Sequence, residues 1–145
     1  MKGLRNVSAM RQQGFTLIEV MIVVAILGIL ATLVVINVAG STDKALVQGT
    51  RSDLQAISQA LDLYKLDNYK YPSTEQGLEA LVVKPDNARN WPEGGYLKKV
   101  PKDKWENPFV YISPGANGPY DLYSLGADGA EGGEGIAADI SVHDL

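Results

Sequence analysis

The chain has 145 residues and a formal net charge of −4, and it contains no cysteine. This length fits one small domain, and the lack of cysteine excludes a disulfide scaffold and cysteine chemistry. The charge is uneven, because the first 14 residues carry Lys2, Arg5 and Arg11 and no acid. The remainder therefore has 10 of the 13 basic residues against all 17 acidic residues, which argues against nucleic acid as a partner.

The chain begins with a basic segment at residues 1–14, followed by an apolar run at 15–38 and an acidic body at 39–145. This order predicts a cytoplasmic leader, a membrane-spanning segment and an exported domain. Between residues 20 and 36 only Thr32 is polar, and with its flanks the run has the roughly 20 residues that spanning requires. A secretory signal peptide is the alternative, but the run is longer than usual and no small-residue cleavage site follows it.

The segment after Gly40 is predicted to be an amphipathic helix. Its apolar residues recur at spacings of three, four and three and form one stripe, which consists of Leu54, Ile57, Leu61 and Tyr64. The proline of Tyr71-Pro72 disfavours helix in the residue before it and is expected to end the helix. A nearly continuous helix from Phe15 to Asn68 is therefore predicted, apolar all round in its first half.

The remainder is predicted to be a small domain of mixed structure. The segment "STEQGLEALVVKP" predicts a short helix after a cap at Ser73 or Thr74. Two apolar runs, "FVYI" and "YDLYSL", flank "SPGANGP" and predict a hairpin. The fold class is therefore α+β, with a long N-terminal α-helical spine, a small C-terminal antiparallel β-sheet head and a Gly/Asp-rich loop.

The junction "GFTLIE" places a glutamate at the start of the apolar run. It resembles the prepilin leader that type IV pilins share with the pseudopilins of type II secretion. The resemblance implies cleavage between Gly14 and Phe15 and N-methylation of Phe15 by a prepilin peptidase/methyltransferase. It also implies that Glu19 meets the amino terminus of a neighbouring subunit during assembly, since a carboxylate in an apolar bundle needs a nearby cation. The alternative is that Glu19 lies in water among lipid headgroups.

Longer blocks of sequence make the resemblance more specific. The blocks "LDLYKLDNYKYPSTEQGLEALV", "GGYLKKVPKD" and "DLYSLGADGAEGGEGIAADI" are similar to the major (G-type) pseudopilins of type II secretion, in the type IV pilin-like superfamily. This similarity implies a pilin-like fold and a structural subunit whose polymerisation drives export of folded proteins across the outer membrane. The subunit would cross the bacterial inner membrane once, with a periplasmic head, before it joins a periplasmic filament. The implied partners are further copies of the chain, minor pseudopilins, the prepilin peptidase and the inner-membrane assembly platform.

The Gly/Asp-rich loop, "LGADGAEGGEGIAADI" at residues 125–140, is a candidate cation site. Calcium binds about six to eight oxygens from carboxylates and backbone carbonyls, which such a loop can supply. From composition alone, a solvated acidic tail explains the same residues equally well. The family resemblance implies a structural calcium ion, with the Leu125 carbonyl and the Asp128 and Asp139 side chains as ligands. Calcium would stabilise a small exported head that lacks disulfides.

Three positions depart from the family pattern, which has proline near Ile36 and reads Asp-Pro-Trp-Gly-Asn-Pro around the tryptophan. Here "DKWENP" has Lys104 and Glu106 in place of the proline and the glycine. Without the proline, the spine is expected to be straighter.

The sequence indicates no enzyme. The one histidine, His143, is expected to be a free residue of a polar tail, and no phosphate-binding, dinucleotide or hydrolase motif is present. Two alternatives to the secretion subunit stay open at this point. One is a type IV pilin of a surface fibre, and the other is a periplasmic domain that is merely anchored by residues 15–38.

Overall fold

The computed structural model describes residues 14–145, except for the side chains of residues 33–39. Most of the predicted leader, residues 1–13, lies outside this description. The chain divides into two compact units, Met1–Gly40 and Ser41–Leu145. We call the second unit the head and the described residues 14–32 of the first unit the N-terminal segment.

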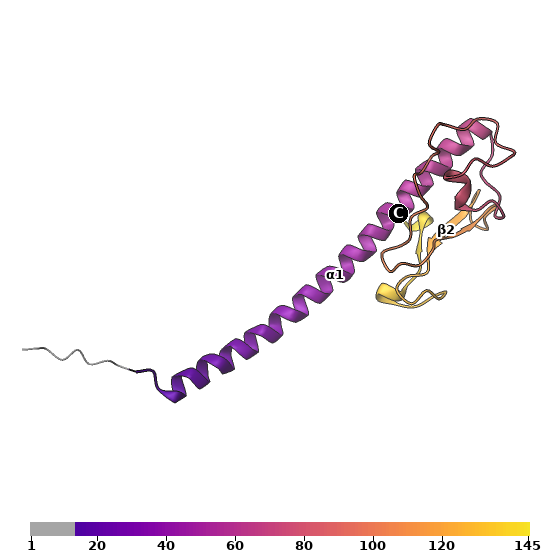
Figure 1. Ribbon diagram of the computed structural model, residues 1–145. Helices are drawn as coiled ribbons and strands as arrows, with labels where there is room; N and C mark the ends of the chain where they lie inside the picture. Colours follow the sequence, from indigo (N-terminus) through magenta and orange to yellow (C-terminus); the bar gives the residue numbers. More distant parts are fainter. Residues whose placement is uncertain (1–13) are drawn as a thin grey trace, which may run out of the picture. The chain divides into compact units, whose positions relative to one another are not determined.

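The longest element is helix α1, Leu17–Asn68, which confirms the predicted spine helix (Figure 1). It begins two residues later than predicted, because Thr16 acts as its N-cap, as described below. It ends at Asn68 because Tyr69 adopts a left-handed conformation with φ of 63°, and its N–H donates to the Lys65 carbonyl at 2.7 Å.

In the described part of the chain, no helix is long and apolar enough to cross a membrane. The predicted span at residues 15–38 includes residues 33–38, whose side chains lie outside the description.

The head contains a three-stranded antiparallel sheet in the order β1-β2-β3, formed by Val110–Ile112, Asp121–Ser124 and Ile140–Ser141. In the first pair Tyr111 lies opposite Leu122, which confirms the predicted hairpin. Strand β3 was not predicted, because two residues are too few to show an alternating pattern. It pairs with β2 through Ser124 and Ile140 and brings the end of the Gly/Asp-rich loop back to the sheet.

Three short 3-10 helices complete the head: η1 Leu78–Leu81, η2 Gly135–Ala137 and η3 Val142–Asp144. The predicted helix in "STEQGLEALVVKP" is thus a 3-10 turn. Its N-cap is Gly77, not Ser73 or Thr74. Ser73 instead closes the preceding turn, where its hydroxyl accepts from the Gln76 N–H at 3.3 Å.

The core of the head lies between the second half of α1 and the sheet. All four residues of the predicted stripe are fully buried and pack with Leu81 of η1 and Leu122 of β2. Burial of one such side chain stabilises a fold by about 1.5–3 kcal/mol. The aromatic residues of the connection to β1 pack against this core and are partly buried, namely Trp91, Tyr96 and Trp105.

A tight turn at residues 103–107 connects α1 to the sheet and contains two of the positions that depart from the family pattern, Lys104 and Glu106. Glu106 has φ of 68°, a conformation that glycine adopts more easily than any other residue. The Lys104 N–H donates to the hydroxyl of Thr50 on α1 at 3.2 Å, a bond that proline cannot make. The Lys104 ammonium also lies 2.7 Å from the Asp53 carboxylate. Lysine therefore ties this turn to α1.

Candidate functional site: the helix start and the Gly/Asp-rich loop

The carboxylate of Glu19 has a partner within its own chain. Its Oε2 accepts hydrogen bonds from the Thr16 N–H at 2.8 Å and from the Thr16 hydroxyl at 2.9 Å. In return, the Thr16 Oγ1 accepts from the Glu19 N–H at 3.3 Å. This reciprocal pair is a capping box that starts α1. This contact was not predicted, although the Thr-x-x-Glu spacing is a known signal for it.

The N-terminal segment exposes an apolar surface on all sides. Phe15 is 88% exposed, and the large apolar residues from Leu17 to Leu30 are all at least half exposed. A groove of about 560 Å³ runs along one face of the segment and has Phe15 and Glu19 at one end, followed by Val20, Ile22, Val23 and Val24. Soluble monomers rarely expose such a continuous apolar surface, so a binding partner or lipid is needed to cover it.

The two ends of the Gly/Asp-rich loop lie side by side. The Ala127 N–H donates to the Ile136 carbonyl at 2.9 Å. Gly126 has φ of 67°, and a Cβ atom there would lie 2.8 Å from the carbonyl oxygens of Ala137 and Ala138. Only glycine fits at this close approach. The fold therefore brings the backbone next to Leu125 close to the backbone that precedes Asp139.

The two predicted carboxylate ligands are exposed, and each accepts one hydrogen bond from a backbone N–H. Asp128 accepts from the Ala130 N–H at 3.1 Å, and Asp139 accepts from the Gly132 N–H at 3.0 Å. Within the part of the chain that the structure describes, no three histidine, cysteine, aspartate or glutamate side chains gather as a metal-binding group. A cation at this loop would therefore take most of its ligands from backbone carbonyls.

The chemistry of these donors fits a hard cation better than a transition metal. Carboxylate and carbonyl oxygens suit calcium, whereas zinc and copper sites use histidine or cysteine. The acidic residues of the loop also influence the pKa of a tyrosine in the sheet. Burial raises the pKa of Tyr123 on β2, and the nearby carboxylates of Glu131 and Asp139 raise this pKa further. The ligand set of Leu125, Asp128 and Asp139 stays a prediction.

His143 is not a free tail residue, contrary to the prediction. Its Nε2 lies 3.2 Å from Oδ1 of Asp121, the first residue of β2. Asp121 also accepts from the Ala116 N–H at 2.7 Å and the Asn117 N–H at 3.4 Å. The Ala116 bond makes the largest contribution to lowering the pKa of Asp121, and His143 adds to it. Together these contacts fasten η3 to the hairpin.

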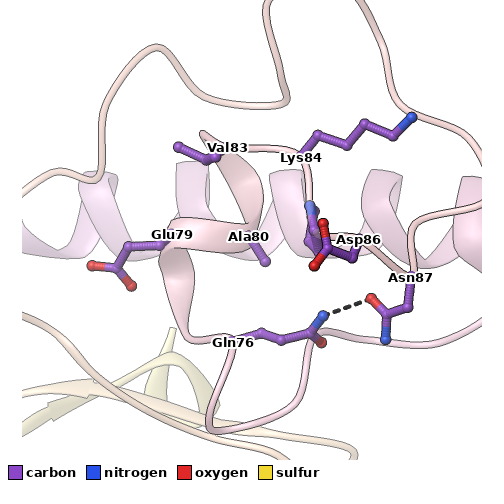
Figure 2. Close-up of a pocket in the computed structure, with 8 residues that line it drawn as sticks. Gln76, Glu79, Ala80, Val83, Lys84, Asp86 and Asn87 are labelled. Carbon is purple, nitrogen blue, oxygen red and sulfur yellow. Dashed lines mark hydrogen bonds between the residues drawn. The ribbon is translucent and has the colours of Figure 1, made fainter.

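A further pocket of about 400 Å³ lies beside η1 (Figure 2). Among the lining residues, Gln76 donates to Asn87 at 2.7 Å, and Figure 2 shows Glu79 pointing away from Asn87. The remaining lining residues are Ala80, Val83, Lys84, Pro85 and Asp86. None of the eight lining residues is a histidine, cysteine or serine.

The sequence and the fold both match known secretion proteins. Residues 37–143 match the family described as type II secretion system (T2SS), protein G, and residues 9–35 match the prokaryotic N-terminal methylation motif. The chain is 59% identical to the type II secretion system core protein G of Pseudomonas aeruginosa, over 90% of this chain and 94% of that protein. It is 58% identical to the core protein G of Vibrio cholerae, over 90% of each chain.

Among solved structures, the fold is similar to the major pseudopilin from the type 2 secretion system of enterohaemorrhagic Escherichia coli. The match has a TM-score of 0.65 and 41% sequence identity, and it covers 75% of this chain and 96% of that chain. These comparisons confirm the resemblance and the predicted pilin-like fold. The chain therefore belongs to the protein G family of the type II secretion system, the family of the major pseudopilins.

Proposed function

We propose that this structural subunit polymerises through its N-terminal segment into a pseudopilus, and that growth of the filament drives export of folded proteins across the outer membrane. The observation that carries the proposal is the apolar surface from Phe15 to Leu30, which is exposed throughout the single chain. Copies that pack these segments side by side remove that surface from water or lipid. The head, which has its own core, then stays folded on the outside of the filament.

Maturation precedes assembly in this proposal. A prepilin peptidase cuts between Gly14 and Phe15 and methylates the new amino terminus at Phe15. The match of residues 9–35 to the methylation motif supports this step. The mature subunit then stays in the inner membrane, with its head in the periplasm, until the assembly platform incorporates it into the filament. Minor pseudopilins complete the filament.

Glu19 sets the register between neighbouring subunits. In the single chain its carboxylate is satisfied by Thr16, the residue next to the new amino terminus. The ammonium group at Phe15 of an adjacent subunit is the cation that this carboxylate accepts in the filament. A charge-assisted hydrogen bond of this type is about twice as strong as a neutral one. Before assembly, Thr16 thus supplies the hydrogen bonds that the Glu19 carboxylate needs.

The proposed role involves no catalysis by the chain itself. The proposal also differs from the two alternatives that the sequence left open, a surface-fibre pilin and a merely anchored periplasmic domain. The protein G match favours a pseudopilin over a surface-fibre pilin. A merely anchored domain would need neither cleavage at Gly14 nor a carboxylate at position 19.

The maturation step is tested in a strain whose own copy of this gene is deleted, by the mass of the recovered chain and by exoprotein secretion. The wild-type chain is expected to begin at N-methylated Phe15 and to restore secretion. Gly14→Glu is expected to stay uncleaved and to secrete nothing, whereas Glu75→Ala, an exposed control in the head, behaves as wild type. Secretion by uncleaved chains would overturn the proposal.

We also propose that the Gly/Asp-rich loop holds one structural calcium ion. The Leu125 carbonyl and the Asp128 and Asp139 carboxylates are its first ligands, and further carbonyls of the loop complete the set. The crowding of Gly126 against the Ala137 and Ala138 carbonyls supports this, since it gathers backbone oxygens in one place. When bound, the ion would join the two ends of the loop and replace a disulfide as a stabilising link.

The calcium proposal is tested by melting the full chain in detergent with calcium and with a chelator. Calcium at 100 times its Kd would stabilise the chain by about 2.7 kcal/mol. Asp128→Ala is expected to remove the difference between the two melts. Glu75→Ala, which lies away from the loop, should keep it. Identical wild-type melts in calcium and chelator would overturn the calcium site.

A further inference from the structure

The Gly/Asp-rich loop is attached to the buried carboxylate of Asp103, which lies outside the loop. Asp103 is only 2% exposed, and three groups donate hydrogen bonds to it. Its Oδ1 accepts from the Trp105 N–H at 3.0 Å and the Asn107 N–H at 2.8 Å. Its Oδ2 accepts from the Ser124 hydroxyl at 2.6 Å. A buried side chain whose oxygens accept several hydrogen bonds fixes the groups around it.

Two of the residues that donate to Asp103, Ser124 and Asn107, also bind Gly126. The Gly126 N–H donates to the Ser124 Oγ at 3.1 Å, and the Gly126 carbonyl accepts from the Asn107 side-chain amide at 2.9 Å. Both backbone polar groups of Gly126 are therefore held by residues that donate to Asp103: Ser124 donates through its hydroxyl, and Asn107 through its backbone N–H. The Asn107 side chain also lies against Gly129, where an added Cβ would be 3.4 Å from its Oδ1.

The orientation of the Leu125 carbonyl follows from the Gly126 N–H. The two groups belong to one peptide unit, which is planar and trans, so they point in opposite directions. Because the N–H points at the buried Ser124 hydroxyl, the Leu125 carbonyl points away from Ser124 and Asp103. This carbonyl is one of the proposed calcium ligands.

We propose that Ser124 and Asn107, both held by Asp103, are positioning residues that orient the loop backbone for calcium. This inference rests on the calcium site proposed above. None of the three residues needs to touch the ion. They act as the outer groups of metal sites do, by fixing the direction of a ligand before the ion binds.

The same turn offers a matched control. Lys104 lies between Asp103 and Asn107 in sequence, but its ammonium reaches Asp53 on α1, not the loop. A substitution at Lys104 therefore loosens the turn from the helix and leaves the bonds to Ser124 and Gly126 in place.

The test is calorimetric titration of calcium into the full chain in detergent, for wild type, Asn107→Ala, Ser124→Ala and Lys104→Ala. Loss of an outer positioning group typically weakens metal affinity by about 10-fold to 100-fold. Asn107→Ala and Ser124→Ala are expected to fall in this range, and Lys104→Ala within about twofold of wild type. Melts in chelator show separately whether each variant is folded.

The outcomes separate this inference from the calcium proposal. If wild type binds no calcium, both fail. If wild type binds and Asn107→Ala binds equally well, the positioning role alone is wrong. Equal losses of calcium affinity in Asn107→Ala and Lys104→Ala would mean that any loosening of the turn weakens binding. That result would also overturn the positioning role. Asn107 is partly exposed, so its variant stays informative even where Ser124→Ala does not fold.

Discussion

Two buried tyrosines of the head differ in whether their hydroxyl groups are satisfied. The Tyr111 hydroxyl donates to the Pro72 carbonyl at 2.8 Å, whereas the Tyr64 hydroxyl has no hydrogen-bond partner among the described residues. Tyr64→Phe is therefore expected to be neutral or stabilising. Tyr111→Phe is expected to lower the free energy of unfolding by about 1–3 kcal/mol, because it leaves a buried carbonyl unpaired. Urea unfolding of the two variants measures this difference, and an equal loss in both would contradict it.

Glu106 is a single residue at which this chain can be made more stable. Its φ of 68° disfavours any side chain, by roughly 1–2 kcal/mol. Glycine removes that strain but adds freedom to the unfolded chain, which costs about 0.5–1 kcal/mol. Glu106→Gly is thus expected to raise the free energy of unfolding by about 0.5–1 kcal/mol. Glu106→Ala keeps the Cβ atom and should show no gain. A matching gain in the alanine variant would exclude backbone strain as the cause.

At the scale of elements, Asp121 links the hairpin to η3 and makes the head sensitive to acid. Its pKa is lowered in the folded chain, mainly by the Ala116 N–H and also by His143. A lowered pKa contributes stability above the unfolded value, and that stability is lost as the pH falls through the folded value. Asp121→Asn should therefore be less stable than wild type at neutral pH, and the two should converge as the pH falls below the ordinary aspartate pKa of about 3.9 and through the lower folded value.

Thermal melts over a pH series measure this convergence. Asp86→Asn removes an exposed carboxylate without a hydrogen bond in the described residues, and it is the control for the loss of one negative charge. A constant difference between wild type and Asp121→Asn down to pH 2 would show that Asp121 acts through shape and not through its charge.

The elements that the sequence predicts well are those with local signals. The stripe on α1 repeats at helical spacing over several turns, and the β1–β2 hairpin has alternating strands around a Gly/Pro-rich turn. Strand β3 has two residues, and its position depends on pairing with β2 from a distance in sequence. His143 was missed for the same reason, since its partner Asp121 is 22 positions away.

The candidate site likewise has a part with local sequence signals and a part that depends on contacts between residues distant in sequence. Gly14, Phe15 and Glu19 belong to a segment that matches a short motif of fixed spacing, and their individual roles stay predictions. Even the missed Thr16 contact has a local signal. The support of the Gly/Asp-rich loop by Asp103 and Asn107 could not be predicted, because the hydrogen bonds to Ser124 and Gly126 form only after the sheet and the turn are in place.

At the scale of the whole molecule, the two units have different ways of removing apolar surface from water. The head buries its apolar residues within itself, around the stripe on α1. The N-terminal segment exposes its apolar residues in the single chain and needs other molecules to cover them. This division fits a subunit of an assembly, and in the proposed function the covering molecules are further copies of the chain.

The central claim is that these copies join through the N-terminal segment, with Glu19 as the contact that sets their register. The most direct measurement is electron microscopy of filaments from cells that produce wild type, Glu19→Ala or the control Glu75→Ala in equal amounts. We expect filaments from wild type and Glu75→Ala, and a loss of at least tenfold in Glu19→Ala, since about 1.4 kcal/mol at the contact suffices for this. Filaments of Glu19→Ala at the wild-type number would contradict the account.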